Sequence, residues 1–265
     1  MRRLIAFPCA GETLIGTLDE APGRTGLLIV SGGNEPRMGA HRGMALLAQR
    51  VAAAGWPVLR FDRRGVGDSS GENGGWSSSA PDLAAAVATF RREAPHVDRL
   101  VGFGNCDAAT ALALFGGALD TLVLANPWVV ERDGDLPPPA AIRARYAQRL
   151  RSPREWIRLL TGGVNLAKLG SGLKAIVASA PEAALTERFA AALLDRDATI
   201  MLAHGDATAI AYADAAKGLD VAAQTMWVET DSHSFARHGD LAVVERAIVR
   251  VLAQVTTPLL SSSRP

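Results

Sequence analysis

Short, mostly apolar runs, each followed at once by a polar or glycine-rich turn, constrain the fold of this chain more than any other feature. They lie at residues 26–30, 57–61, 100–103, 121–125, 199–203 and 225–228. Such runs are typical of strands buried on both faces of a sheet. Segments with apolar residues at helical spacing separate or follow them, at 41–54, 80–93, 107–116 and 241–255. This alternation predicts an α/β fold, with a mostly parallel twisted sheet covered by helices on both faces.

Two segments depart from that alternation. Residues 2–19 alternate loosely around Gly11 and predict a β-hairpin at the sheet edge. Residues 131–195 contain three consecutive prolines and several helical patterns but no clear strand, so we expect a helical lid inserted over the carboxyl edge of the sheet. The predicted core is then 1–130 with 196–255, and 256–265 form a flexible tail.

The predicted lid carries a run of arginines whose meaning the sequence leaves open. They are Arg143, Arg145, Arg149, Arg151, Arg154 and Arg158. A solvated basic face is one interpretation, and a lid that meets an anionic group of the substrate is the other.

Composition narrows the classes of function. A net charge of +1 offers no electrostatic basis for binding nucleic acid or a membrane surface. No window approaches the ~20 apolar residues of a membrane span, and no signal peptide follows Arg2 and Arg3. Two cysteines, Cys9 and Cys106, do not make a disulfide framework, and no spacing of His, Cys and Asp resembles a metal site. We therefore expect a cytoplasmic protein with no metal and no cofactor; the sequence does not indicate its oligomeric state.

The turn after the third run holds a reactive residue type. Residues 104–108 read Gly-Asn-Cys-Asp-Ala, which has the shape of the nucleophile elbow G-x-S-x-G with Cys106 in place of serine and Ala108 in place of the last glycine. A helix N-terminus beneath Cys106 would favour its thiolate. The alternative is a buried structural cysteine at the start of a core helix.

An acid and a base follow two later strands. Asp206 comes after the run at 199–203 and His233 after the run at 225–228, so the chain order is nucleophile, acid, histidine. Because parallel strands end at one edge of a sheet, we expect Cys106, Asp206 and His233 to meet there as a catalytic triad. His204 is a second candidate for the base, and Asp231 is a second candidate for the acid.

These features resemble the α/β-hydrolase superfamily over residues 12–255. Residues 62–69, Asp-Arg-Arg-Gly-Val-Gly-Asp-Ser, look like its D-x-R-G-x-G-x-S segment, and 31–33, Ser-Gly-Gly, stand where its H-G-x oxyanion loop would be. More narrowly, 31–37 (Ser-Gly-Gly-Asn-Glu-Pro-Arg), 104–108 and 125–128 (Ala-Asn-Pro-Trp) resemble the exosortase A system-associated hydrolase 1 family, encoded near exopolysaccharide and protein-sorting genes. The cysteine nucleophile is similar to that of dienelactone hydrolase, a more distant relative.

The resemblance implies roles for further residues. The backbone N–H groups of Gly33 and Asp107 would form the oxyanion hole. The Asp107 carboxylate would otherwise simply complement the helix dipole. Glu35 corresponds to a glutamate that, in dienelactone hydrolase, communicates with the thiolate; the alternative here is an ion pair with Arg37. Asn34 beside it is a second accessory candidate.

Two residues after the run at 121–125 are candidates for the substrate pocket. Asn126 and Trp128 lie at the predicted strand end beneath the lid. They would either line the pocket or pack in the core.

The expected activity is hydrolysis of an ester, thioester or lactone through an acyl-enzyme on Cys106. The expected partner is a small-molecule acyl or acylated-saccharide substrate, within the exopolysaccharide pathway that the resemblance implies. Two alternatives stay open: acyl transfer on the same triad, and a catalytically silent scaffold or binding protein with this fold.

Overall fold

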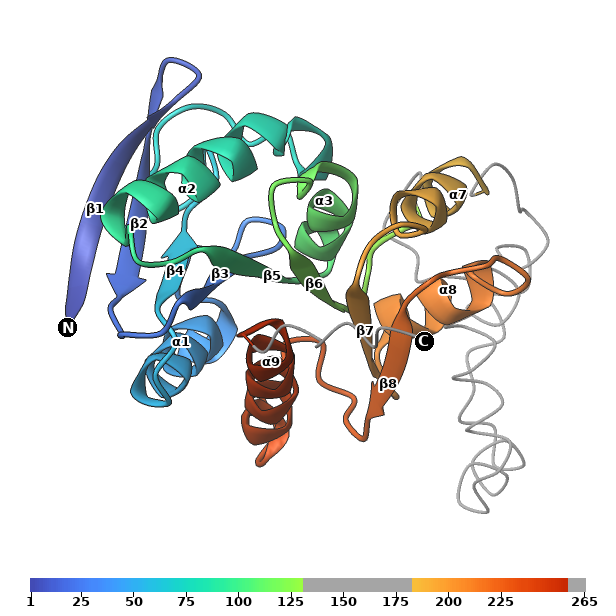
Figure 1. Cartoon of the computed structure of the whole chain (residues 1–265). Helices are drawn as coiled ribbons and strands as arrows, with labels where there is room; N and C mark the ends of the chain where they lie inside the picture. The colour runs from blue at the N-terminus through green and yellow to red at the C-terminus, as the bar shows by residue number, and fades with distance from the viewer. Residues whose placement is uncertain (131–182, 257–265) are drawn as a thin grey trace, which may run out of the picture.

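The computed structural model describes residues 1–130 and 183–256. In this part of the chain eight strands form one sheet, in the order β1-β2-β4-β3-β5-β6-β7-β8 (Figure 1). β1 runs antiparallel to β2, and β2 antiparallel to β4; all other neighbours are parallel. The mostly parallel sheet that the apolar runs predict is confirmed. The strands are β1 (Arg2–Cys9), β2 (Glu12–Asp19), β3 (Thr25–Val30), β4 (Val58–Phe61), β5 (Arg99–Asn105), β6 (Thr121–Ala125), β7 (Ala198–Ala203) and β8 (Gln224–Val228).

The first two strands form the predicted hairpin. Ala10 and Gly11, the two residues between them, both have positive φ, 51° and 87°. Two-residue turns of this kind match the right-handed twist of the flanking strands.

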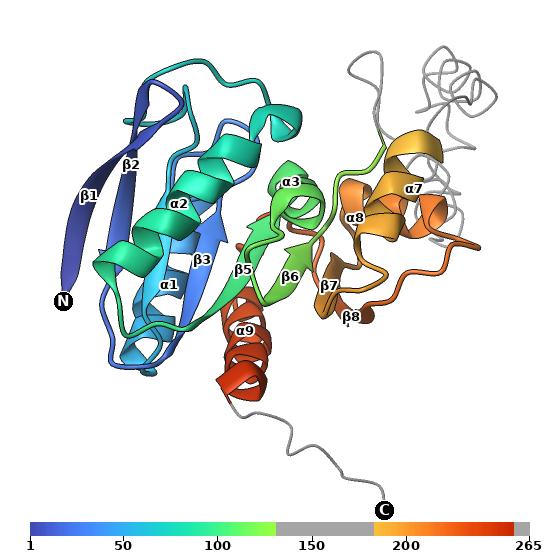
Figure 2. The same ribbon diagram turned by 45° about the horizontal axis from the view of Figure 1, so that its top comes forward.

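Helices cover both faces of the sheet (Figure 2). Along β3 the side chains alternate between two cores: Leu28 and Val30 lie in one, Leu27 and Ile29 in the other. The first core is closed by α2 (Ala80–Glu93), α3 (Asp107–Phe115), α7 (Ala183–Ala192) and α8 (Ala207–Ala215), and the second by α1 (Gly43–Ala53) and α9 (Asp240–Thr256). Short 3₁₀ turns, η1 (Ala40–Arg42) and η2 (Trp76–Ser78), precede α1 and α2.

Two elements differ from the sequence-based expectation. The helix predicted from residue 41 begins only at Gly43, because His41 and Arg42 adopt φ of 52° and 61° and interrupt the turn before it. The run at 225–228 predicts a buried strand, but only Val228 of the five residues of β8 is buried, because β8 is an edge strand of the sheet.

Most of the predicted lid, residues 131–182, lies outside the described residues, as do 257–265 of the predicted tail. The remainder of the predicted lid includes α7, which packs on the sheet. Phe189 of α7 is fully buried and meets Tyr212 of α8 edge to face, with ring centroids 5.6 Å apart. Thr186 donates a hydrogen bond to the Val129 carbonyl at 3.3 Å.

Candidate active site

The backbone at Cys106 has the shape of a nucleophile elbow. Cys106 follows β5 directly, has φ 62° and ψ −127°, and is the residue from which α3 begins. A side chain at Gly104 would approach the Ala108 backbone to 2.9 Å, which explains why position 104 holds glycine. Cys106 is partly exposed, unlike Cys9, which is buried.

The acid and the histidine meet as predicted. Nδ1 of His233 lies 3.0 Å from Oδ1 of Asp206. The other carboxylate oxygen of Asp206 accepts the backbone N–H groups of Thr208 and Ala209, at 3.0 and 2.9 Å, and so caps α8. Both oxygens of Asp206 are therefore fixed, and the carboxylate holds the Nδ1 edge of the imidazole in place.

The histidine also reaches the thiol. Burial alone would lower the pKa of His233, but hydrogen bonds to Asp206 and Cys106, with their charges, raise it to about 10. A protonated imidazole beside a sulfur stabilises the thiolate, the reactive form of cysteine. The structure thus brings together the three residues predicted as nucleophile, base and orienting acid.

The two rival residues are engaged elsewhere. The side chain of His204 is 60% exposed and tilts against Trp227, with ring centroids 5.0 Å apart. Asp231 forms an exposed ion pair with Arg237, at 2.9 Å. Neither set of contacts involves Cys106, so His204 does not take the place of the base, and Asp206 rather than Asp231 is bonded to His233.

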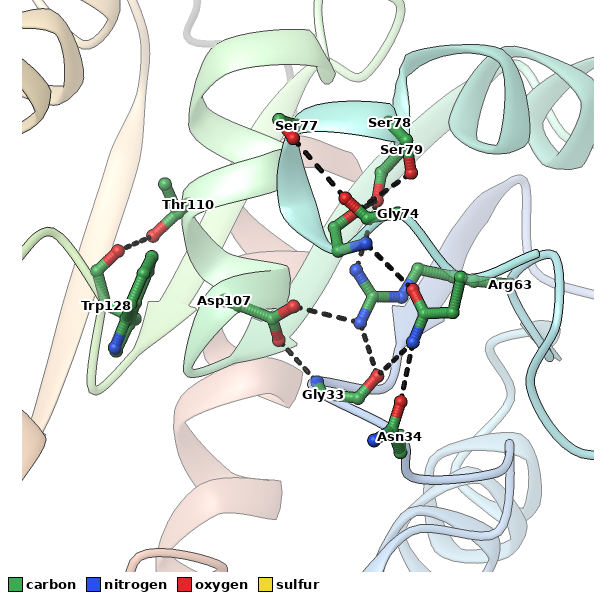
Figure 3. A network of polar contacts seen from close by, with 12 residues as sticks. Gly33, Asn34, Arg63, Gly74, Ser77, Ser78, Ser79, Asp107, Thr110 and Trp128 are labelled. Atoms are coloured by element: carbon green, nitrogen blue, oxygen red, sulfur yellow. Dashed lines mark hydrogen bonds and ion pairs between the residues drawn. The ribbon is translucent and has the colours of Figure 1, made fainter. Parts of the chain in front are cut away.

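The predicted oxyanion loop is tied to the elbow by a carboxylate. The N–H of Gly33 donates to Oδ1 of Asp107 at 2.5 Å (Figure 3). Oδ2 of Asp107 accepts from the Arg63 guanidinium at 3.0 Å, and Arg63 also donates to the Gly33 carbonyl at 2.8 Å and to Ser79 at 3.0 Å. One of the two predicted oxyanion donors is therefore occupied by a side chain of the site itself.

The second predicted oxyanion donor is the backbone N–H of Asp107. Among residues 1–130 and 183–256, no acceptor lies in hydrogen-bond range of the Asp107 backbone N–H. As the first residue of α3, Asp107 has no partner for this group within the helix. The N–H is therefore available to an anion at the elbow.

Arg63 was not identified from the sequence. Its side chain is only 3% exposed, although it lies in a polar connection after β4. The sequence signal was a pair of arginines, Arg63 and Arg64, one residue after a buried strand. In sheets of this kind, active sites lie at the carboxyl ends of the strands.

Residues 62–69 hold the end of this loop through contacts with Arg37. Asp62, fully buried, accepts the backbone N–H of Arg37 and that of Asp68, and pairs with the Arg37 guanidinium. A side chain at Gly67 would meet the Asp62 carboxylate at 2.5 Å, and φ at Gly67 is +56°. The segment therefore supports the site rather than supplying a reacting group.

The accessory candidates contact other parts of the loop. Oδ1 of Asn34 accepts from Asn73 at 2.7 Å, and Oε2 of Glu35 accepts the Ala40 N–H at 3.3 Å. Arg37, considered as a partner for Glu35, pairs instead with Asp62 and, at 2.8 Å, with Asp68.

The two pocket candidates differ in exposure. Trp128 is partly exposed beside Cys106: its backbone N–H donates to the Cys106 carbonyl at 3.3 Å, and its own carbonyl accepts from the Thr110 hydroxyl at 2.5 Å. Asn126 is fully buried, and its amide is bonded to Asn105, Ala203 and the His233 carbonyl. Asn105, the residue before the nucleophile, was not singled out from the sequence, although a polar side chain closing a buried strand was a visible signal.

Two absences apply to the described residues alone. In 1–130 and 183–256, no three His, Cys, Asp or Glu side chains are grouped so as to hold a metal ion. Over the same ranges, every helix is too short or too polar to cross a bilayer.

Comparison with known proteins identifies the fold. No family model and no curated protein match the chain. Among solved structures, it is similar to the alpha/beta hydrolase GrgF from Penicillium sp. sh18, with 18% identity, a TM-score of 0.67 and coverage of 96% of this chain and 98% of that one. The Pyrococcus furiosus esterase Pf2001 is 14% identical, with a TM-score of 0.61 and coverage of 96% of this chain and 90% of that one. The thioesterase domain from the curacin biosynthetic pathway is 12% identical, with a TM-score of 0.55 and coverage of 94% of this chain and 99% of that one. The chain therefore has the α/β-hydrolase fold, as its strand order indicates.

Proposed function

We propose that this α/β-hydrolase-fold protein is a cysteine-dependent hydrolase of esters, thioesters or lactones. The observation that carries the proposal is the position of His233, whose Nδ1 lies 3.0 Å from the Asp206 carboxylate and whose pKa is raised by both Asp206 and the neighbouring Cys106. A nucleophile, a base in contact with it and a third group orienting that base form the arrangement that acyl transfer through a covalent intermediate requires.

The chemistry proceeds in two halves. His233 accepts the proton of Cys106, and the thiolate attacks the substrate carbonyl to give a tetrahedral oxyanion. Collapse expels the alcohol or thiol, which takes the proton from His233 and leaves a thioester on Cys106. His233 then removes a proton from water, the hydroxide attacks the thioester, and the acid departs as the thiol is restored. Asp206 stays ionised and stabilises the imidazolium in both halves.

The oxyanion is held by the N–H groups of Asp107 and Gly33. Because the Asp107 carboxylate accepts the Gly33 N–H in the absence of substrate, the substrate oxygen must take its place. Arg63 remains 3.0 Å from the other carboxylate oxygen and can retain the side chain when that hydrogen bond breaks. The hole is thus completed only when an oxyanion competes for the Gly33 N–H.

The substrate class is inferred from likeness. The printed names of two similar structures, an esterase and a thioesterase domain, support an acyl substrate. The motifs at 31–37, 104–108 and 125–128 support membership of the exosortase A system-associated hydrolase 1 family, and with it an acylated saccharide or a related small molecule.

The test is a panel of short and long acyl esters and thioesters assayed with the unmodified chain, Cys106→Ala and Cys106→Ser. We expect Cys106→Ala to lower turnover by about 10³-fold or more, because removing the nucleophile leaves only binding and the oxyanion hole. Cys9→Ala is the matched control and should retain activity, since Cys9 is buried against Asp82 at 3.4 Å and outside the site. Full activity in Cys106→Ala on a substrate that the unmodified chain hydrolyses would exclude the mechanism.

A further inference from the structure

Two buried asparagines connect the strand ends that carry the three reactive residues. Asn126 follows β6, has no exposed surface, and accepts the backbone N–H of Ala203 at 2.8 Å through its side-chain oxygen. Its side-chain nitrogen donates to Oδ1 of Asn105 at 3.0 Å. Asn105 immediately precedes Cys106, and Ala203 ends the strand that leads to Asp206.

Both amides converge on one backbone atom of the catalytic histidine. The side-chain nitrogen of Asn105 donates to the His233 carbonyl at 3.0 Å, and that of Asn126 donates to the same oxygen at 3.2 Å. A carbonyl has two lone pairs, so this acceptor is fully used. Buried amides are costly to leave unpaired, so the arrangement favours one position of the carbonyl over its alternatives.

The rest of the histidine loop is held by contacts that do not involve the His233 backbone. Residues 232–235, which include His233, are flanked by exposed residues, Asp231 on one side and 236–239 on the other. Other contacts hold its neighbours: Thr230 donates to Asp240 at 2.6 Å, and the Arg237 N–H donates to Asp240 at 3.1 Å. Ser232 accepts the backbone N–H groups of Phe235 and Ala236, at 3.1 and 2.9 Å, and Phe235 is buried in the second core. The two asparagines therefore fix the backbone of His233 itself to the sheet.

The backbone of Asn126 shows that this placement is demanding. Its φ of 40° lies in the left-handed region, which asparagine tolerates better than other residues with side chains. Asparagine at this position supplies both the uncommon conformation and the amide that points to His233.

We propose that Asn105 and Asn126 are positioning residues that set the His233 ring against Cys106 and Asp206 by holding the His233 carbonyl. The inference rests on the proposed function, because it assigns the pair to the histidine of that triad. The expected effect can be measured apart from hydrolysis, because the amides determine whether the imidazole can stabilise the thiolate, with or without a substrate.

The test uses alkylation of the Cys106 thiol by iodoacetamide across pH, which needs no substrate. Asn105→Leu keeps the branched shape and the number of heavy atoms, and removes the amide's donor and acceptor without adding charge. We expect alkylation near neutral pH to slow by about one to two orders of magnitude, since small displacements of a reacting group have effects of this size. The pH profile should move toward that of His233→Ala, and Asn105→Leu should add nothing further in the His233→Ala background.

A control separates positioning from loss of structure. Thr110→Val removes a hydrogen bond from a fully buried side chain on the nucleophile's helix, the one to the Trp128 carbonyl at 2.5 Å, without touching His233. It should leave the pH profile unchanged. If Asn105→Leu does not fold, Asn105→Ala serves in its place, because the smaller side chain cannot clash.

The outcomes distinguish the two proposals. If His233→Ala changes the profile while the Asn105 variant follows the unmodified chain, the positioning role is wrong and the triad stands. If the unmodified chain and His233→Ala give the same profile, the proposed triad itself fails. A profile in the Asn105 variant that matches His233→Ala, with Thr110→Val unchanged, supports the positioning role.

Discussion

Replacing Arg63 with methionine tests how strongly the oxyanion loop depends on its buried ion pair. The side chains of Arg63 and Asp107 are 3% and 13% exposed, and their nitrogen and oxygen lie 3.0 Å apart. Arg63→Met keeps an apolar stem but leaves the carboxylate without a counter-charge. Breaking a buried pair by removing one partner costs about 3–5 kcal/mol, so we expect the free energy of unfolding to fall by about that amount.

The assay is equilibrium unfolding in urea, in which a loss of this size lowers the midpoint by about 1–2 M. Arg50→Met is the matched control, because Arg50 and Glu245 form a pair at 3.2 Å between α1 and α9 with 48% and 27% exposure. Surface pairs contribute about 0–1 kcal/mol, so this variant should shift the midpoint little. Adding Asp107→Ala to Arg63→Met removes the unpaired charge and should recover part of the loss.

The reasoning would be refuted by equal, small shifts in Arg63→Met and Arg50→Met. That result would mean that water reaches the Asp107 carboxylate and screens it, despite its low exposure. A double variant less stable than the sum of the two single changes would likewise show that the unpaired charge is not the source of the loss.

Three further predictions concern the same edge of the sheet. Gly32→Ala should lower hydrolysis by about 10²-fold, because its Cβ would meet the Asn105 carbonyl at 2.5 Å and displace the loop. Gly33→Ala has open space around its Cβ but a φ of +56°, so in the same assay it should cost less, through backbone strain of about 1–2 kcal/mol. The raised pKa of His233 adds stability that is present below pH 6.5 and lost as the pH rises to about 10, so the deficit of Asp206→Asn in urea unfolding should shrink over that window. With 37% of the His233 side chain exposed, solvent screening limits that change to about 1 kcal/mol; a constant deficit would contradict it. Mass spectrometry after iodoacetamide should find one labelled thiol in the native chain and two after denaturation, because burial raises the pKa of Cys9 to about 11; labelling of Cys9 in the native chain would count against its burial.

The elements of this fold were predictable because hydrophobic runs and turn residues are local signals. The runs at 121–125 and 80–93 coincide with β6 and α2, and the ends of the other strands agree to within two residues. The same signals placed Cys106, Asp206 and His233 at one edge, since parallel strands end together. Strand position within the sheet is not a local property, which is why the exposure of β8 was not foreseen.

The side-chain contacts of the site were less accessible to sequence reasoning. The pattern around Gly33 predicts an oxyanion donor, but the carboxylate of Asp107 that occupies it comes from the other side of the elbow. Asn126 reads equally well as a pocket or a core residue, and only its hydrogen bonds to Asn105 and His233 distinguish the two. Such contacts depend on distances between segments up to 128 positions apart, for which periodicity carries no information.

The double use of the Asp206 carboxylate couples helix architecture to reactivity. One oxygen starts α8 and the other orients the imidazole, so neither can shift without the other. Changes in the first turn of α8, such as Thr208→Pro, would delete a backbone donor to that carboxylate and weaken the histidine's anchor from a position that touches neither the imidazole nor the thiol. In the proposed mechanism, variation in this helix turn would therefore change activity while Cys106, His233 and Asp206 stay the same.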